Sequence, residues 1–131
     1  MPLVSVTRLR LRSIRYLLPF AFRASAVGKQ ALGTSGCHGV LTRKTRGLAF
    51  WTLTMWDDEE SMRSFLSNSP HRETMSKLSP WCDEASVAHW IQEGAALPDW
   101  GTATQRLLGS GRLLRLAHPS AAHRNGEINV S

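Results

Sequence analysis

His71 follows Pro70 near the middle of the chain and is the residue best suited to chemistry. An imidazole titrates near neutral pH, so it can act as a general acid or base, and its neutral form can ligate iron. The sequence also allows a structural role, in which the ring caps the following helix or hydrogen-bonds Asn68 or Ser69. We predict His71 as the catalytic residue, with the structural role as the alternative.

Aromatic side chains are concentrated on both sides of His71. Four of the five tryptophans lie between residues 49 and 93. Flat apolar rings suit a pocket for an aromatic or polyene ligand, although packing in the core or between subunits would also use them. His89 alternates with two apolar residues, which also fits a core position in a strand. The predicted pocket-lining residues are Trp51, Trp56, Trp81, Trp90, Phe65 and His89.

Several other kinds of site are not supported. The chain has no GxSxG, HExxH, P-loop or dinucleotide-binding motif, so hydrolase and nucleotide-dependent functions lack a basis. Cys37 and Cys82 are far apart and match no CxxC spacing, and His38 beside Cys37 is too small a set for a metal site. Two unpaired thiols are typical of a reducing compartment, so we predict a cytoplasmic protein.

An acidic run, Asp57 to Glu60, lies between the aromatic residues and His71. Carboxylates at a helix start complement the exposed amides and the helix dipole. A metal site is the alternative, but consecutive helical residues point in different directions and no oxygen-ligand loop motif accompanies them. We interpret the run as a helix start.

The charge of the chain is unevenly distributed. The net charge is +6, yet residues 1–50 hold nine basic and no acidic residues, whereas residues 51–100 hold three basic and nine acidic. The arginines are dispersed through apolar patterns and no nucleic-acid motif is present, so pairing between the two halves is favoured over nucleic-acid binding. The Arg-rich N-terminus also has the composition of an organellar transit peptide, which is an alternative to a first strand. No apolar stretch reaches eighteen residues, so no membrane span is expected.

The periodicity of the chain predicts an α+β fold. Strands are expected at residues 3–12, 37–44, 48–56 and 81–92, and helices at 13–31, 57–67, 70–78 and 97–108. The order β-α-β-β-α-β, with the second helix split, is the ferredoxin-like plan. We predict a domain at residues 1–108 and a loosely attached C-terminal tail at residues 109–131.

The strand at residues 48–56 is apolar on both faces. A strand of this kind is covered on both sides, and one small helical layer covers only one. We therefore expect a partner subunit on the other face, which makes the protein a homodimer.

The segment FWTLTMWDDEESMRSFLSNSPHRETM, followed by WCDEASVAHW, resembles the dimeric α/β-barrel superfamily that includes the antibiotic-biosynthesis monooxygenases. Within it, the chain is most similar to the branch related to spheroidene monooxygenase. The shared pattern is a strand ending in Trp56, an acidic turn, Met62-x-x-Phe65, a Pro-His-x-x-x-Met segment, and Trp81 with an acid before the last strand. The resemblance covers residues 2–108.

The resemblance implies two sheets that meet face to face in a dimer, and members with differing chemistry. These include cofactor-independent oxygenases and haem-binding or haem-degrading enzymes. If this chain bound haem as such relatives do, His71 would be the iron ligand. Aligned on Phe65, however, the ligand position of haem-degrading relatives falls nearer Met75. Their asparagine on the first strand is replaced by Val4-Ser5-Val6-Thr7. Both departures argue against haem degradation.

The combined prediction is an oxidoreductase of the monooxygenase type. It binds a small apolar or aromatic molecule between sheet and helices, with no cofactor or with haem on His71. The alternative is a non-enzymatic dimeric binding or structural protein.

Overall fold

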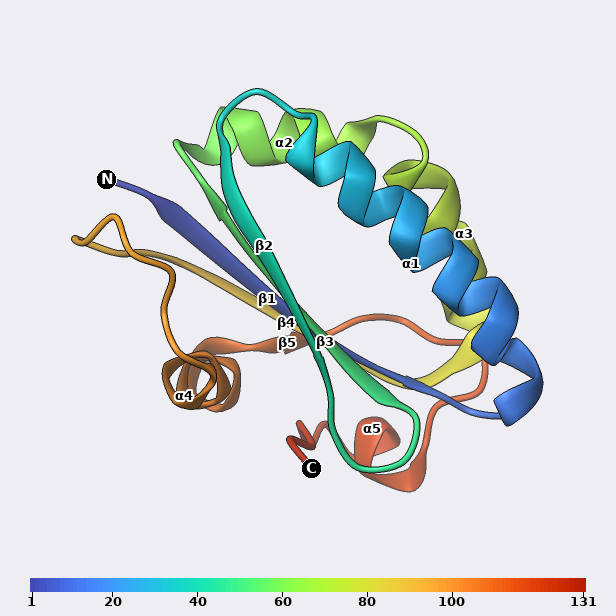
Figure 1. The fold of residues 1–131 in the computed structure, drawn as a ribbon. Coiled ribbons are helices and arrows are strands. Elements are labelled where there is room, and N and C mark those ends of the chain that lie inside the picture. The colour runs from blue at the N-terminus through green and yellow to red at the C-terminus, as the bar shows by residue number, and fades with distance from the viewer.

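The computed structural model describes residues 1–131 and shows an open, antiparallel, five-stranded sheet with helices on both faces (Figure 1). The strands are β1 (Leu3–Leu11), β2 (Cys37–Lys44), β3 (Ala49–Trp56), β4 (Cys82–Ile91) and β5 (Arg112–Leu113). The helices are η1 (Ile14–Tyr16), α1 (Leu17–Leu32), α2 (Glu59–Ser67), α3 (His71–Trp81), α4 (Trp100–Ser110) and α5 (Ala121–Arg124).

The strand order is β2-β3-β1-β4-β5, with the first strand at the centre. The first four strands and the helices between them confirm the predicted ferredoxin-like α+β fold, including the split second helix. The sheet of the single chain is open, and the dimeric arrangement of the predicted α/β barrel stays a prediction. No helix has the length and apolar character needed to cross a membrane.

The helix starts follow from capping side chains. Asp58 is the N-cap of α2, and its side chain accepts a hydrogen bond from the Ser61 amide at 2.9 Å. Asp99 caps α4 in the same way, through the Thr102 amide at 2.7 Å. The structure thus places the acidic run at a helix start. Pro19 lies in the first turn of α1, where amides have no helical partner.

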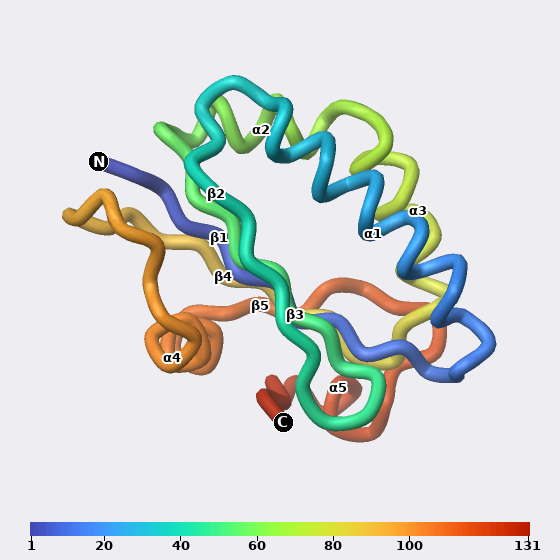
Figure 2. The backbone as a smooth tube through the Cα atoms, in the orientation of Figure 1, coloured from blue at the N-terminus to red at the C-terminus, as the bar shows by residue number.

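The helical layer of α1, α2 and α3 lies on one face of the sheet, and α4 lies on the other (Figure 2). It packs through two separate apolar clusters, one at each end of the sheet. One cluster comprises Leu3, Ala31, Trp56, Met62 and Phe65. The other comprises Leu9, Leu11, Phe20, Leu78, Cys82 and Ala85.

The opposite face is covered by the chain's own C-terminal third. The core cluster on this face joins strand residues that point away from α1, α2 and α3 to residues of α4. Its members are Val4, Val6, Trp51, Leu53, Met55, Ala88, Trp90, Ala103 and Leu107. Leu97, Trp100, Ile128 and Val130 pack against this cluster. The reason we gave for a partner subunit was therefore wrong, because α4 and the C-terminal residues bury the second apolar face of β3. The homodimer itself stays a prediction.

Residues 109–131, predicted as a loosely attached tail, make specific contacts with the sheet. Strand β5 pairs with β4, opposite Ser86 and Val87. The Ser120 amide donates to the Asp83 carbonyl at 2.8 Å, and His123 is buried. Sequence periodicity did not reveal this attachment, because β5 has two residues and α5 has four, which are too short to repeat.

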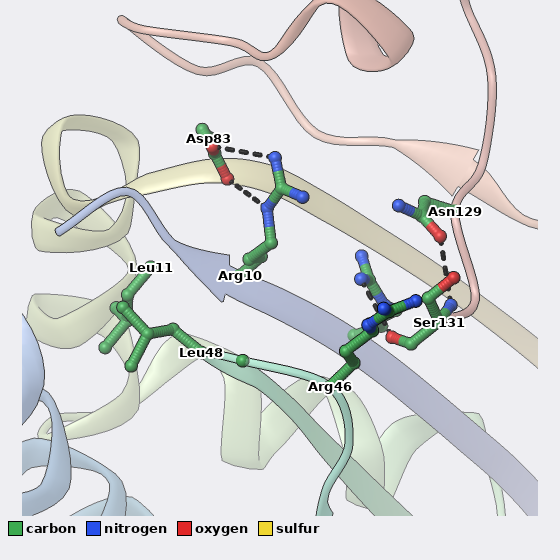
Figure 3. Close-up of a pocket in the computed structure, with 9 residues that line it drawn as sticks. Arg10, Leu11, Arg46, Leu48, Asp83, Asn129 and Ser131 are labelled. Carbon is green, nitrogen blue, oxygen red and sulfur yellow. Dashed lines mark hydrogen bonds and ion pairs between the residues drawn. The ribbon is translucent and has the colours of Figure 1, made fainter. Parts of the chain in front are cut away.

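The basic first strand pairs with the acidic fourth strand inside the domain. Arg8 is 2% exposed and its Nη1 donates to Glu84 Oε1 at 2.9 Å. Arg10 donates to both carboxylate oxygens of Asp83, at 2.8 and 2.9 Å (Figure 3). Burial alone would raise the pKa of Glu84, but hydrogen bonds from Arg8 and Ser120 and the charge of Arg10 bring that pKa below its ordinary value. Two of the nine basic residues of residues 1–50 are thus paired with carboxylates of β4.

Candidate functional site

A cavity of about 410 Å³ lies between the sheet and the helical layer. It forms because the residues that face the helices at the middle of β1 and β3 are small and hydroxyl-bearing, whereas those near the ends of β1 are large and apolar. On β1, Leu3 and Leu9 belong to the two end clusters, while Ser5 and Thr7 lie between them. Small hydroxyl side chains leave the centre of the sheet uncovered, so Thr52 at mid-strand is exposed.

The floor of the cavity consists of two rows of residues that run across the strands. The register places Ser5 opposite Thr54 on one side and His89 on the other. The neighbouring row runs through Thr42, Thr52, Thr7 and Val87. The Thr54 hydroxyl accepts a hydrogen bond from Trp56 Nε1 at 2.9 Å. The floor therefore offers several hydroxyl groups to a bound molecule.

The roof of the cavity is mostly apolar. It is made by Phe20, Ala24, Val27, Gly28 and Ala31 of α1, by Met62, Phe65 and Leu66 of α2, and by Thr74, Met75 and Leu78 of α3. A Cβ atom at Gly28 would meet no atom within 4 Å. Apolar walls with a few polar groups are typical of small-molecule sites.

His71 begins α3 and lines the cavity next to Phe65. Its backbone amide is held by Gln30 Oε1 at 2.7 Å, and its ring centroid lies 4.6 Å from that of Phe65. Its Nδ1 atom is buried and has no hydrogen-bond partner. Burial lowers the pKa of His71, partly offset by the Leu66 carbonyl, and this shift favours the neutral ring.

Thr74 lies three residues after His71 on the same face of α3 and also lines the cavity. Its Oγ1 atom is likewise buried without a partner. Two neighbouring polar atoms without partners are uncommon, because a buried polar group that lacks a hydrogen bond destabilises the fold. Both residues belong to the part of the roof that α3 contributes.

Three of the predicted site residues, His71, Phe65 and His89, line the cavity together. None of the four predicted tryptophans lines it. Trp51 and Trp90 belong to the cluster on the opposite face, Trp56 stacks on Phe65 with centroids 5.1 Å apart, and Trp81 stacks on Tyr16 at 6.1 Å. Trp51 and Trp90 are core residues, because strand parity turns them away from α1, α2 and α3 and toward α4.

The ionisable side chains that line the cavity are His71, His89 and Arg112. No Asp or Glu lines it, although the chain has ten. His89 is an exposed residue on the floor, and Arg112 reaches the cavity from β5. No group of three or more His, Cys, Asp or Glu side chains could hold a metal ion.

Sequence reasoning missed Thr74, Arg112 and the hydroxyl residues of the floor. A signal for the floor exists, because Ser5 and Thr7 share a parity on one strand and Thr52 and Thr54 share a parity on its neighbour. Hydroxyls that interrupt the apolar face of two adjacent strands indicate a gap in the packing. Arg112 had no such signal, since it lies on a strand of two residues.

Solved structures of similar fold include an oxygenase. The chain aligns with SnoaB, a cofactor-independent oxygenase from Streptomyces nogalater, with a TM-score of 0.60 and 12% identity over 75% of this chain and 98% of that one. Rv0793 from Mycobacterium tuberculosis gives 0.66 and 9% over 73% and 100%. A proposed antibiotic biosynthesis monooxygenase from Chloroflexus aurantiacus gives 0.56 and 16% over 73% and 97%. The TM-scores show that the chain shares the ferredoxin-like fold of these proteins, as the resemblance implied.

No curated protein sequence matches the chain. Residues 20–119 match the model of a family described as a domain of unknown function, DUF3291. The match runs from α1 through β5 and includes the helical roof and most of the floor of the cavity. The chain therefore belongs to the DUF3291 family.

Proposed function

We propose that the protein binds a small apolar or aromatic molecule in the cavity and catalyses insertion of oxygen into it without a cofactor. The observation that carries the proposal is the position of His71, which lines an apolar cavity and whose buried Nδ1 has no protein partner. The shared fold with a cofactor-independent oxygenase supports it. In this proposal His71 is the general base.

The reaction needs a substrate that itself reduces molecular oxygen. For an activated methylene group the balance is RCH₂R′ + O₂ → RC(=O)R′ + H₂O. The imidazole of His71 removes one proton from the carbon, and the carbanion passes an electron to O₂. The two radicals combine into a peroxide anion, which takes up the proton from the imidazolium. Loss of the second C–H proton with cleavage of the O–O bond leaves the ketone and water.

The chain supplies a base, a fixed orientation and a partly water-free environment for these steps. A neutral imidazole accepts a proton readily, and burial favours its neutral form. The floor hydroxyls of Ser5, Thr7 and Thr52 can donate hydrogen bonds to the oxygen that bears the negative charge of the carbanion. The apolar roof shields the reacting carbon from water.

Haem, the other cofactor of the prediction, fits the lining less well. His71 could provide one nitrogen for the iron. A haem also carries two propionate groups, and Arg112 is the only arginine or lysine that lines the cavity. The residues present therefore fit a ligand with fewer charges, and we derive no step through haem.

A non-enzymatic binding protein is the second candidate, since the unpaired Nδ1 and Thr74 Oγ1 atoms could simply bind a polar group of the ligand. Oxygen consumption separates the two candidates. We expect a panel of phenols with an acidic benzylic methylene to include a compound that the protein oxidises, with one atom of ¹⁸O₂ in the ketone. His71→Ala should lower the rate by about 10²–10⁴-fold, the usual contribution of a general base.

His118→Ala is the matched control, because His118 is exposed and does not line the cavity. It should keep the full rate. Equal rates in wild type and His71→Ala would contradict the catalytic role. Binding of these compounds with no oxygen uptake would favour the non-enzymatic candidate.

A further inference from the structure

We infer that the molecule bound in the cavity carries one negatively charged group, a carboxylate, and that Arg112 binds this group at the β4–β5 edge of the sheet. The inference rests on the proposed small-molecule site and specifies its ligand. The starting observation is the charge of the lining, which contains two histidines and one arginine but no carboxylate. A ligand with one negative charge would balance the permanent charge of Arg112.

The position of Arg112 is defined by backbone pairing. Strand β5 is antiparallel to β4, and Arg112 lies opposite Val87. Val87 is a floor residue and shares its strand face with His89, two residues further along. Beyond β5, Leu114 also lines the cavity, and the chain continues along the sheet toward the end where α1 begins (Figure 2). The guanidinium is thus supplied at the side of the cavity where His89 lies.

Arg112 differs from the arginines that the fold uses for its own stability. Arg8, Arg10, Arg23 and Arg63 each form an ion pair with a carboxylate. Arg112 takes part in none of the ion pairs of the structure and lines an apolar cavity. An unpaired charge beside a region of lower dielectric attracts an opposite charge more strongly than the same charge in open water does.

A carboxylate suits this guanidinium, because the planar fork of an arginine donates two parallel hydrogen bonds to the two oxygens. The remainder of the ligand must be apolar, since α1, α2 and α3 present mostly hydrocarbon to the cavity. An aromatic or alicyclic monocarboxylate meets both conditions. Arg112 would hold the acid group at the sheet edge while the apolar body lies beneath the helices.

The test compares two probes of nearly identical shape, 2-naphthoate and 2-naphthamide, by isothermal titration. Wild type should bind the acid about tenfold more tightly than the amide, in line with one charge-assisted hydrogen-bonded pair. Arg112→Gln should remove this preference and leave the affinity for the amide unchanged. Arg112→Lys should keep part of it, because the charge remains while the fork is lost.

Arg115→Gln is the matched control, because Arg115 is an exposed arginine of the same segment that does not line the cavity. It should behave as wild type. Equal affinities for acid and amide in wild type, or a preference that survives in Arg112→Gln, would overturn the inference and leave the proposed function intact. Failure of both probes to bind would overturn the inference together with the proposed site.

Discussion

The rings of His71 and Phe65 are in contact, with centroids 4.6 Å apart and planes inclined by 57°. Phe65 in turn stacks on Trp56 at 5.1 Å, so the imidazole is attached to the buried end cluster through one aromatic neighbour. This contact fixes the ring position and removes water from one side of it. It also provides the desolvation that lowers the pKa of His71.

Stability should fall with acid because of His71. Its pKa in the folded protein is below the value of about 6.5 for an unfolded chain, so the unfolded state takes up the proton first. The free energy of unfolding should therefore decrease as the pH falls below about 6.5 and level off below the folded pKa. Urea denaturation between pH 7.5 and 5 should show a smaller decrease for His71→Gln than for wild type. Parallel curves for the two proteins would contradict the burial of the ring.

The hydrogen bond from Trp56 Nε1 to Thr54 should contribute measurably to stability. Thr54→Val leaves a fully buried indole N–H without an acceptor, which costs about 1–3 kcal/mol. Thr52→Val is the control, because Thr52 lies on the same face of β3 but is exposed, and it should change the free energy of unfolding by less than about 0.5 kcal/mol. A similar loss in the free energy of unfolding for both variants would show that the buried hydrogen bond does not add to stability.

The buried pair of Arg8 and Glu84 should be costly to break from one side. Arg8→Met leaves a buried carboxylate without its closest cation and should destabilise the fold by about 3–5 kcal/mol. The same substitution in a Glu84→Gln background should cost much less. Arg63→Met breaks an exposed pair on α2 and should cost no more than about 0.5 kcal/mol. Chemical denaturation of wild type, Arg8→Met, Glu84→Gln and the double variant gives the coupling free energy between the two side chains. A coupling free energy near zero would contradict a stabilising ion pair.

Larger side chains at Gly28 should lower the affinity for a ligand in the cavity without lowering the stability of the fold. Gly28→Ala should stabilise α1 by up to about 1 kcal/mol and leave room for 2-naphthamide. Gly28→Leu should keep a stable helix, since a Cβ meets no atom there, while its larger side chain enters the cavity and lowers the affinity for the probe. An unchanged affinity in the folded Gly28→Leu protein would place the probe elsewhere.

Haemin should not give a Soret band that depends on His71. The lining offers a single arginine for two propionates, so any association with haemin should be equal in wild type and His71→Ala. Absorbance titration of both proteins checks this. A band present in wild type and absent in His71→Ala would restore the haem-binding form of the prediction.

The order and type of the elements could be predicted because each long strand and helix has its own periodicity. Assignment of residues to faces was harder. The strand at residues 49–56 is apolar on both parities, so nothing in it distinguishes Trp51, which packs beneath α4, from Trp56, which packs beneath α2. His71 was found from its residue type and its position at a helix start. Thr74 and Arg112 depend on tertiary placement, which local patterns do not contain.

The two end clusters hold the helical layer to the sheet at both ends, and the hydroxyl residues lie between these supports. Phe20, Phe65 and Leu78 belong to these clusters and also line the cavity, whereas the floor hydroxyls belong to neither cluster. Substitutions at Ser5, Thr7, Thr42 and Thr52 can alter which molecule is bound at little cost in folding. Related chains can in this way acquire different ligand preferences on one unchanged scaffold.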